Sequence, residues 1–271
     1  MIDLQSAAGD GMLIDALRRN PLLALDFDGT LAPIVAQPAD AAIDPRVPPL
    51  LAPLQGRLPV AIVSGRGLDD LAPRVPLPGL VLIGNHGNEW AAYADAGGAG
   101  EDEAAAAATR RAKQRQVVLD WAAALRQPLA ELGPGIVFEQ KLLSLSLHYR
   151  HAPAPGPARE ALLRLVDGLH PEPEIIDGKF VLNLMAPGLV TKFEAVAELQ
   201  RRRRAGTVIF VGDDVTDERV FERAPADWLT IRVWDDEADA AGTASAARAF
   251  VHRVDGVIEL LERMERLLRN L

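Results

Sequence analysis

The chain has 271 residues, 49% of them apolar, so it is long enough for one large domain or two modest ones, and its composition argues against extensive disorder. It contains no cysteine, which excludes disulfide scaffolds, thiolate zinc sites and cysteine nucleophiles. The net charge of −9 argues against nucleic acid as the main partner, although an acidic chain can still bind an anionic small molecule in a locally positive site.

The first twenty residues do not read as a secretory leader. They carry Asp3, Asp10 and Asp15 and lack a basic region followed by an apolar one. No apolar run along the chain reaches the roughly 18 residues of a membrane-spanning helix. We therefore expect a soluble cytoplasmic protein with no membrane partner. We expect a monomer, with a dimer as the alternative.

Five short apolar runs predict the strands of a parallel sheet. Because each run is continuously apolar rather than alternating, we expect a sheet that is covered on both faces. Helical stretches separate several of the runs, so the pattern predicts an α/β fold with a doubly wound parallel sheet. The runs are 22–27, 59–63, 80–83, 207–211 and 229–233.

The middle of the chain predicts a different, α+β architecture. Helices are expected over 103–126 and 156–169. In the segment 141–150, leucines alternate with polar residues, which predicts a strand with one buried and one open face; 179–185 alternates less cleanly. We therefore expect an inserted unit between the third and fourth parallel strands, with linkers near 95–100 and 187–188.

The last segment, 257–271, predicts an amphipathic helix. Apolar residues recur at helical spacing, and two heptads are too few to indicate a coiled coil. We expect this helix to pack on the sheet. The four arginines at 201–204 are expected at the exposed end of a preceding helix.

Two aspartates, Asp26 and Asp28, stand at the end of the first apolar run. Side chains at the carboxyl end of a parallel strand point into the crevice where open α/β sheets bind ligands. Carboxylates that close repel each other unless a cation lies between them, and Mg²⁺ prefers oxygen ligands. The alternative is a simple Asp28–Gly29 turn, which explains the glycine but not Asp26.

A second acidic cluster follows the run at 207–211. Asp213 and Asp214 stand at that strand's end, and Asp217 and Glu218 open a helix. Acids in a first helical turn are explained by capping and by the helix dipole, so we assign no further role to Asp217 and Glu218. Acids at two strand ends predict one shared metal site.

Ser64 and Lys192 complete the candidate site. Ser64 lies where a strand meets a helix, so its hydroxyl and the backbone N–H groups that follow are suited to a phosphate oxygen; a simple helix cap is the alternative. Lys192 lies near the start of a helix and could neutralise a phosphoryl group; an ordinary surface lysine is the alternative.

The order of these residues resembles the haloacid-dehalogenase-like (HAD) phosphatase superfamily, whose first motif matches DFDGT at 26–30. The resemblance implies a catalytic core over 1–90 and 187–271 with a C2-type cap over 91–186. It implies Asp26 as the nucleophile that forms an aspartyl-phosphate and Asp28 as the general acid and base. It further implies phosphate binding by Ser64, Gly65 and Lys192. Mg²⁺ would be held by Asp26, the Asp28 carbonyl, Asp213 and Asp214.

Further motifs resemble the trehalose-6-phosphate phosphatase family. They are SGR at 64–66, GNHGNEW at 84–90, FEQKLLSLSLHYR at 138–150 and DDVTDE at 213–218. The resemblance implies hydrolysis of trehalose 6-phosphate to trehalose and phosphate, in trehalose biosynthesis. Glu139 and Lys141 alternate onto one face of a strand, where they could bind sugar hydroxyls; an exposed strand face is the alternative. Further implied substrate contacts are Arg66, His86, His148, Arg150 and Asn183, and His148 and Arg150 could equally be structural.

The stretch before Lys192 departs from that family. Asn183 replaces a glutamate, Met185 and Ala186 replace a basic-proline pair, and Phe193 replaces a glycine. One extra residue precedes Lys192, so Thr191 occupies the ungapped lysine position. The alternatives are a related phosphatase for sucrose phosphate or mannosylphosphoglycerate, a phosphomutase-like phosphotransferase, and a sugar-phosphate sensor without turnover.

Overall fold

The computed structural model describes residues 1–35, 37–91, 101–178, 180–235 and 244–270, with the side chains at 101–108, 110 and 111 not described. The chain divides into two compact units. The first comprises Met1–Ala96 and Val190–Leu271, and the second comprises Gly97–Leu189. The linker predicted at 95–100 lies outside the described residues.

An eight-stranded sheet forms the centre of the first unit. Its strand order is β1-β12-β11-β10-β2-β3-β4-β5, and every pair is parallel except β4 with β5. The strands are β1 Ile2–Asp3, β2 Pro21–Leu25, β3 Val60–Val63, β4 Val81–Gly84, β5 Glu89–Trp90, β10 Thr207–Gly212, β11 Leu229–Trp234 and β12 Ala249–His252.

All five predicted parallel strands are confirmed, as β2, β3, β4, β10 and β11. The sequence analysis did not find β1, β5 and β12. These strands have two to four residues and lie towards the edges of the sheet, where a strand needs no continuous apolar run.

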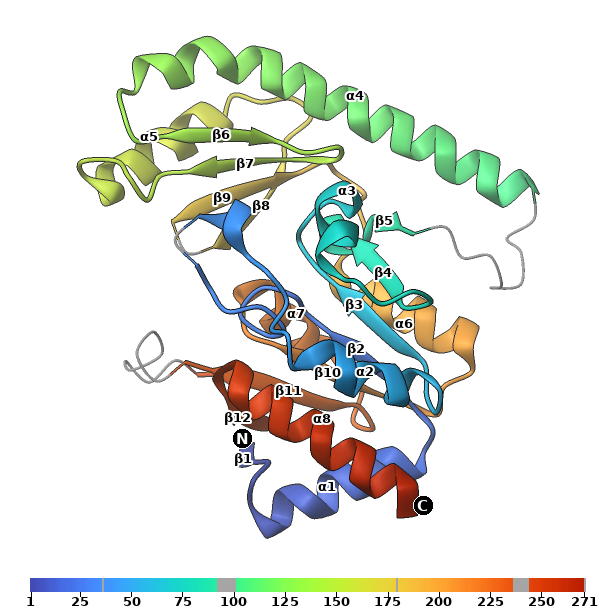
Figure 1. Ribbon diagram of the computed structural model, residues 1–271. Coiled ribbons are helices and arrows are strands. Elements are labelled where there is room, and N and C mark those ends of the chain that lie inside the picture. The colour runs from blue at the N-terminus through green and yellow to red at the C-terminus, as the bar shows by residue number, and fades with distance from the viewer. Residues whose placement is uncertain (36, 92–100, 179, 236–243, 271) are drawn as a thin grey trace. The chain divides into compact units, whose positions relative to one another are not determined.

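Helices cover both faces of this sheet (Figure 1). Alternate strand residues belong to opposite layers: Leu23 packs with α1, α2 and α8, whereas Leu22 packs with α6 and α7. Burial on both faces explains why these strands read as unbroken apolar runs. The helices are α1 Ala7–Arg18, α2 Val47–Gln55, α6 Lys192–Arg203, α7 Val215–Arg223 and α8 Arg253–Asn270; short turns are η1 Pro38–Asp40, α3 Leu68–Leu71, η2 Ala72–Arg74 and η3 Asn85–Gly87.

The predicted C-terminal helix is α8, and it packs on the sheet through Val257, Leu260, Leu261 and Met264, as expected. The arginines at 201–204 are exposed at the end of α6, also as expected. In the part of the chain that the structure describes, no helix combines the length and apolar character needed to cross a membrane.

The second unit contains a four-stranded antiparallel sheet in the order β6-β7-β9-β8. Leu145 and Leu147 lie on the face that packs with α4 and α5. The elements are α4 Glu101–Glu131, β6 Val137–Gln140, β7 Ser144–His148, α5 Pro155–Val166, β8 Glu174–Gly178 and β9 Val181–Met185. The predicted α+β insert is thus confirmed as two helices and a separate sheet; Lys179, in the second predicted strand, lies outside the described residues.

The prediction of an open polar face on the strand at 141–150 is wrong at Ser144 and Ser146, which are both buried. Ser146 lies opposite Glu139 on one neighbouring strand and opposite Asn183 on the other. The small serine side chain is therefore flanked by two larger ones in the same row. Alternation along a strand predicts which face a residue occupies, but the neighbouring strands decide how far water reaches it.

Candidate active site

The carboxyl ends of β2 and β10 lie side by side at the centre of the parallel sheet. The two strands pair in parallel with Leu25 opposite Val211, and the Asp26 N–H donates to the Val211 carbonyl at 2.9 Å. The acids that follow each strand are consequently brought together. Gly29 has a φ of 74°, and a Cβ atom there would lie 2.0 Å from an Asp213 carboxylate oxygen, so only glycine fits between these acids.

Three carboxylates converge at this edge. Asp26, Asp213 and Asp217 each offer an oxygen, and these oxygens all lie within 4.8 Å of one another. Burial, with the nearby charge of Asp217, raises the pKa of Asp26 to about 8. Burial and the charge of Asp26 likewise hold the pKa of Asp213 well above its usual range. Such a group of acids is stable in its ionised form only beside a compensating positive charge.

Lys192 supplies part of that charge. Its Nζ lies 2.8 Å from Asp26 Oδ1 and 2.8 Å from Asp217 Oδ1, and its side chain is only 3% exposed. Burial opposes the charge of Lys192, but Asp217 and Asp26 outweigh it and raise the pKa of this lysine. The alternative of a surface lysine is therefore wrong.

The donor set fits a divalent metal. One ammonium group leaves two negative charges uncompensated when all three carboxylates are ionised. Asp213 Oδ1 is buried and accepts no hydrogen bond from the described residues, so this oxygen lacks a protein donor among them. Hard oxygen ligands with a net charge of this size suit a cation such as Mg²⁺.

Asp217 takes the place in this cluster that the sequence analysis gave to Asp214. The Asp214 carboxylate caps α7 by accepting from the Val215 N–H at 2.7 Å, and it is not among the three acids that meet. Asp217 was expected only to cap the helix. It does belong to the capping box, but it is fully buried and also binds Lys192. Its position four residues after Asp213, on the first helical turn, could have indicated in the sequence that it lies near the site.

Asp28 lies outside the carboxylate cluster and pairs with Arg66. Arg66 donates from Nε and Nη2 to the two carboxylate oxygens of Asp28, both at 2.7 Å. Arg66 had been assigned to substrate through the family resemblance. In the structure its guanidinium is occupied by Asp28, by Asp70 at 2.6 Å and by the Pro38 carbonyl at 2.9 Å.

Ser64 is buried at the end of β3, beside β2. Its hydroxyl accepts from the Arg66 N–H at 3.1 Å, and the N-cap of α3 is Gly67, so the alternative of Ser64 as a helix cap is wrong. A Cβ atom on Gly65 would lie 2.6 Å from the His86 ring. The His86 ring can therefore lie against the backbone after Ser64 only because residue 65 has no side chain.

A left-handed turn at 85–87 fixes the segment 64–67. Asn85 and His86 have φ values of 47° and 55°, which are unusual for residues other than glycine. Their N–H groups donate to the carbonyls of Arg66 at 2.7 Å and Ser64 at 3.0 Å. His86 thus packs against Gly65, and the strained turn is held by tertiary contacts.

Glu89, which the sequence analysis did not single out, supports the same segment. Its carboxylate is buried and accepts from the Leu68 N–H at 2.7 Å and from the Asn85 side chain at 3.3 Å. Glu89 therefore ties the start of α3 to the left-handed turn. The acid in the GNHGNEW segment was the available signal, because a charged residue beside a buried strand needs a partner.

In the second unit, Glu139, Lys141 and His148 lie together on one face of the antiparallel sheet. Glu139 Oε2 lies 2.9 Å from His148 Nε2 and 3.9 Å from Lys141 Nζ. Asn183 lies in the same row, where its side-chain oxygen accepts from the Ser146 hydroxyl at 2.7 Å. The predicted common face of Glu139 and Lys141 is confirmed, and His148 shares it.

Arg150 lies beyond the end of β7. Its guanidinium lies 5.9 Å from the centre of the Phe180 ring, beside the edge-to-face contact of Phe180 with Tyr149. A cation over an aromatic ring near the end of a strand is a sufficient structural role for Arg150.

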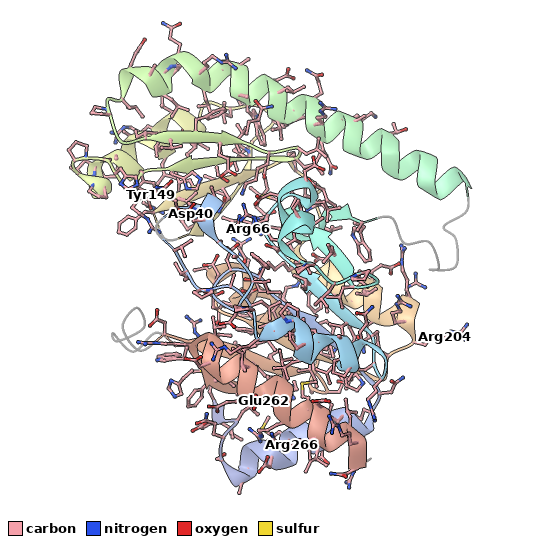
Figure 2. All side chains as sticks on the ribbon, in the orientation of Figure 1. Asp40, Arg66, Tyr149, Arg204, Glu262 and Arg266 are labelled. Carbon is pink, nitrogen blue, oxygen red and sulfur yellow. The ribbon has the colours of Figure 1, made fainter. Side chains whose placement is uncertain are left out.

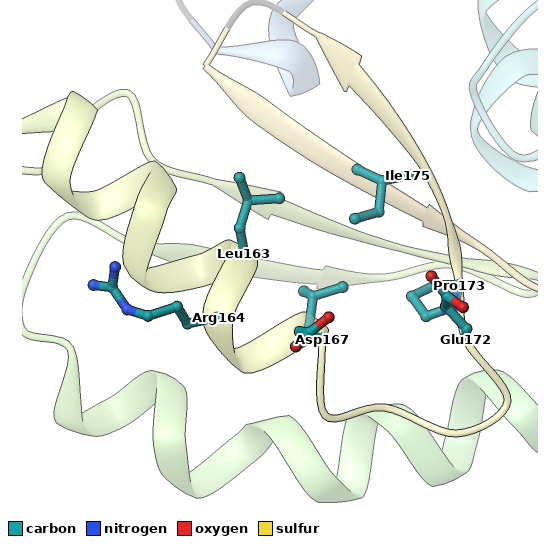
Figure 3. Close-up of a pocket in the computed structure, with 7 residues that line it drawn as sticks. Leu163, Arg164, Asp167, Glu172, Pro173 and Ile175 are labelled. Atoms are coloured by element: carbon teal, nitrogen blue, oxygen red, sulfur yellow. The ribbon is translucent and has the colours of Figure 1, made fainter.

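A pocket of about 350 Å³ lies elsewhere in the second unit, between the end of α5 and the start of β8 (Figure 3). Leu163 and Ile175 line it together with three charged residues, Arg164, Asp167 and Glu172. None of the residues assigned to catalysis or substrate binding lines this pocket.

Comparison with known proteins agrees with this geometry. The model of the trehalose-phosphatase family matches residues 24–227. A trehalose-phosphate phosphatase of Mycobacterium tuberculosis is 32% identical over 271 residues, which takes in 96% of this chain and 65% of that protein. The chain therefore spans slightly less than two thirds of the length of this curated relative.

Solved structures share the architecture. A trehalose-6-phosphate phosphatase related protein has a TM-score of 0.71 at 25% identity, over 92% of this chain and 99% of that one. The C-terminal domain of C. albicans trehalose-6-phosphate phosphatase has a TM-score of 0.69 at 22% identity, over 95% of this chain and 96% of that one. At that identity the second likeness concerns the fold alone. The predicted HAD-like fold, a doubly wound core with an inserted α+β unit, is confirmed.

Proposed function

Because this chain belongs to the trehalose-phosphatase family, we propose that it is a phosphatase that hydrolyses trehalose 6-phosphate to trehalose and inorganic phosphate. The observation that carries the proposal is the buried cluster of Asp26, Asp213, Asp217 and Lys192 at the ends of β2 and β10. We assign the catalytic core to residues 1–90 and 187–271 and the cap to residues 91–186.

In the first step, a carboxylate oxygen of Asp26 attacks the phosphorus atom. A bond forms between Asp26 and phosphorus while the bond from phosphorus to the sugar oxygen breaks, and Asp28 gives its proton to that departing oxygen. In the second step, water attacks the phosphorus of the aspartyl-phosphate and transfers a proton to Asp28. The bond between Asp26 and phosphorus breaks, so both aspartates return to their starting states.

Positive charge and hydrogen-bond donors stabilise the phosphoryl group during both steps. Lys192 lies within hydrogen-bond distance of Asp26, so its ammonium group is next to the atom that attacks. We assign the remaining phosphate contacts to the Ser64 hydroxyl and to the backbone N–H group of Gly65, where the chain follows β3.

We infer that the carboxylate cluster holds Mg²⁺. Asp26, Asp213 and Asp217 would supply ligand oxygens, and the Asp28 carbonyl is the further ligand that the family resemblance implies. When bound, the metal would neutralise charge on the cluster and on the phosphoryl oxygens. Asp214 would support the site by capping α7 rather than by binding the metal.

Removal of divalent metal by a chelator is expected to stop hydrolysis, because the clustered carboxylates would then repel both one another and the phosphate. Activity should fall below about 1% of the untreated enzyme and return on addition of Mg²⁺. Phosphate release is the measurement, with Ca²⁺ addition as a test of metal identity. Hydrolysis that persists in excess chelator would disprove the metal assignment.

We assign recognition of the sugar to Glu139, Lys141 and His148, whose acceptor and donor groups share one face. A site of this kind rejects analogues that lack the matching hydroxyls, since its own polar groups would stay unpaired. Asn183 already accepts from Ser146. This internal hydrogen bond, at a position where the family carries a glutamate, favours a second candidate, a related phosphatase for another disaccharide phosphate.

A substrate panel separates the two candidates. With Mg²⁺ present, kcat/KM is measured for trehalose 6-phosphate, sucrose 6-phosphate, glucose 6-phosphate and p-nitrophenyl phosphate. We expect trehalose 6-phosphate to exceed the other three by at least about tenfold, the effect of about 1.4 kcal/mol of differential binding in the transition state. Comparable values for all four would support a less selective sugar phosphatase, and a preference for sucrose 6-phosphate would support the second candidate.

A further inference from the structure

Arg66 holds Asp28 by both oxygens of its carboxylate. The two hydrogen bonds, from Nε and Nη2, are each 2.7 Å long, which is the parallel arrangement that fixes both the position and the plane of a carboxylate. Asp28 is partly exposed and lies in the turn after β2, and the side-chain hydrogen bonds described for its carboxylate both come from Arg66. Arg66 is therefore the group that sets where this carboxylate points.

Arg66 is itself held in place. Its side chain is only 11% exposed, and its guanidinium lies 5.6 Å from the centre of the Phe27 ring. Nη1 donates to Asp70 at 2.6 Å and Nη2 donates to the Pro38 carbonyl at 2.9 Å. Figure 2 shows Arg66 next to the segment that carries Asp40, which follows Pro38 in η1.

A second arginine extends this support. Arg74 binds Asp70 through Nε at 3.0 Å and through Nη2 at 2.6 Å, and its Nη1 donates to the carbonyls of Ala39 and Ala41. The chain of contacts from Asp28 through Arg66 and Asp70 to Arg74 lies wholly in the first unit. It connects the turn after β2 to α3 and η2.

The hydrogen bonds that Arg66 already makes argue against its predicted role as a substrate contact. An arginine has five N–H donors, and contacts with described residues use four of them. Removing Asp28 from this arrangement would leave a buried guanidinium short of a partner. A role in binding sugar hydroxyls would compete with these existing bonds.

We propose that Arg66 is a positioning residue, which orients the carboxyl group of Asp28 towards the leaving oxygen, and not a sugar contact. The proposal rests on the proposed function, because it concerns the proton that Asp28 delivers when the ester bond breaks. A group that acts through the general acid matters only when the leaving atom needs a proton. A dependence on whether the leaving atom needs a proton therefore distinguishes a positioning role of Arg66 from sugar binding and from a purely structural role.

The test compares two substrates that differ in one atom. They are trehalose 6-phosphate and its analogue in which sulfur replaces the bridging oxygen at carbon 6. A thiol is far more acidic than an alcohol, so the sulfur ester departs without a proton from Asp28. Arg66→Gln is expected to lower kcat/KM on the oxygen ester at least about tenfold more than on the sulfur ester, as loss of general-acid catalysis requires.

Asp28→Asn is expected to give the largest change in the ratio of the two kcat/KM values. The double variant with Arg66→Gln should change that ratio no further, because Arg66 acts through Asp28. Arg66→Lys should lie between wild type and Arg66→Gln, since an ammonium group cannot hold both oxygens in one plane. The ratio is insensitive to the fraction of folded enzyme, because both substrates are measured on the same preparation.

Arg46→Gln is the matched control. Arg46 makes the same bidentate contact with Asp44 on the surface of the first unit, at 2.9 and 2.8 Å. The Arg46→Gln variant should therefore leave the ratio of the two kcat/KM values unchanged. Equal losses on both esters in Arg66→Gln would overturn the proposal and restore a sugar-binding or structural role. If the wild-type enzyme prefers another sugar phosphate, the proposed substrate is wrong, but the proposal for Arg66 is still tested. The oxygen and sulfur phosphate esters of that other sugar are then compared.

Discussion

Asp26→Asn is expected to lower kcat on trehalose 6-phosphate at least about 10,000-fold, because an amide oxygen cannot form the bond to phosphorus on which both steps depend. The loss should be equally severe on p-nitrophenyl phosphate, whose leaving group is better, since the nucleophile is needed whatever group departs. Phosphate release measured over hours gives the residual activity.

The same variant should remain folded. Lys192 would keep its ion pair with Asp217, and the loss of Asp26 removes one negative charge from a cluster that carries an excess of them. The free energy of unfolding is therefore expected to change by no more than about 1–2 kcal/mol. Asp15→Asn, on the exposed side of α1, serves as the control and should retain full activity. Activity of Asp26→Asn within tenfold of wild type would eliminate the aspartyl-phosphate mechanism.

Lys192→Met is expected to lower turnover strongly and also to destabilise the fold. The lysine bridges Asp26 and Asp217 with two contacts of 2.8 Å, and all three side chains are buried. Without the lysine, the carboxylates of Asp26 and Asp217 lose their counter-charge. Leaving an ionised carboxylate buried without its partner lowers the free energy of unfolding by about 3–5 kcal/mol. Denaturant unfolding measures this loss, and kcat should fall at least about 100-fold because a phosphoryl-stabilising charge is gone.

Thr191→Ala is the control that tests the alignment of this region. Thr191 is the N-cap of α6 and its hydroxyl donates to Glu194, so its replacement by alanine should cost about 1 kcal/mol of stability with near-normal activity. The opposite pattern, a stable and active Lys192→Met with an inactive Thr191→Ala, would show that the lysine had been assigned to the wrong position.

The central strands and the first acids of the site could be predicted from sequence because each follows from a local rule. An unbroken apolar run predicts a strand buried on both faces, and an acid directly after it predicts a side chain at the carboxyl edge. Asp26 and Asp213 meet both conditions. Lys192 required the family resemblance and a one-residue shift, and its contact with Asp26 supports that shift.

Asp217 and the pairing of Asp28 with Arg66 could not be predicted in the same way. An acid on a first helical turn has an ordinary capping role, and only the position of α7 against β10 shows that Asp217 also faces Lys192. Asp28 and Arg66 are 38 residues apart, and their contact depends on the parallel pairing of β2 with β3. The spacing of residues along the chain does not predict which side chains meet across neighbouring strands.

Trapping of the intermediate tests the central claim most directly. The wild-type enzyme is mixed with trehalose 6-phosphate and Mg²⁺, quenched in acid within milliseconds, and its peptides are analysed by mass spectrometry. We predict one phosphoryl group on the peptide that contains Asp26, removed by hydroxylamine as an acyl phosphate is. A phosphoryl group on a different residue, or phosphate release with none on the enzyme during turnover, would contradict the assignment of Asp26 as the nucleophile.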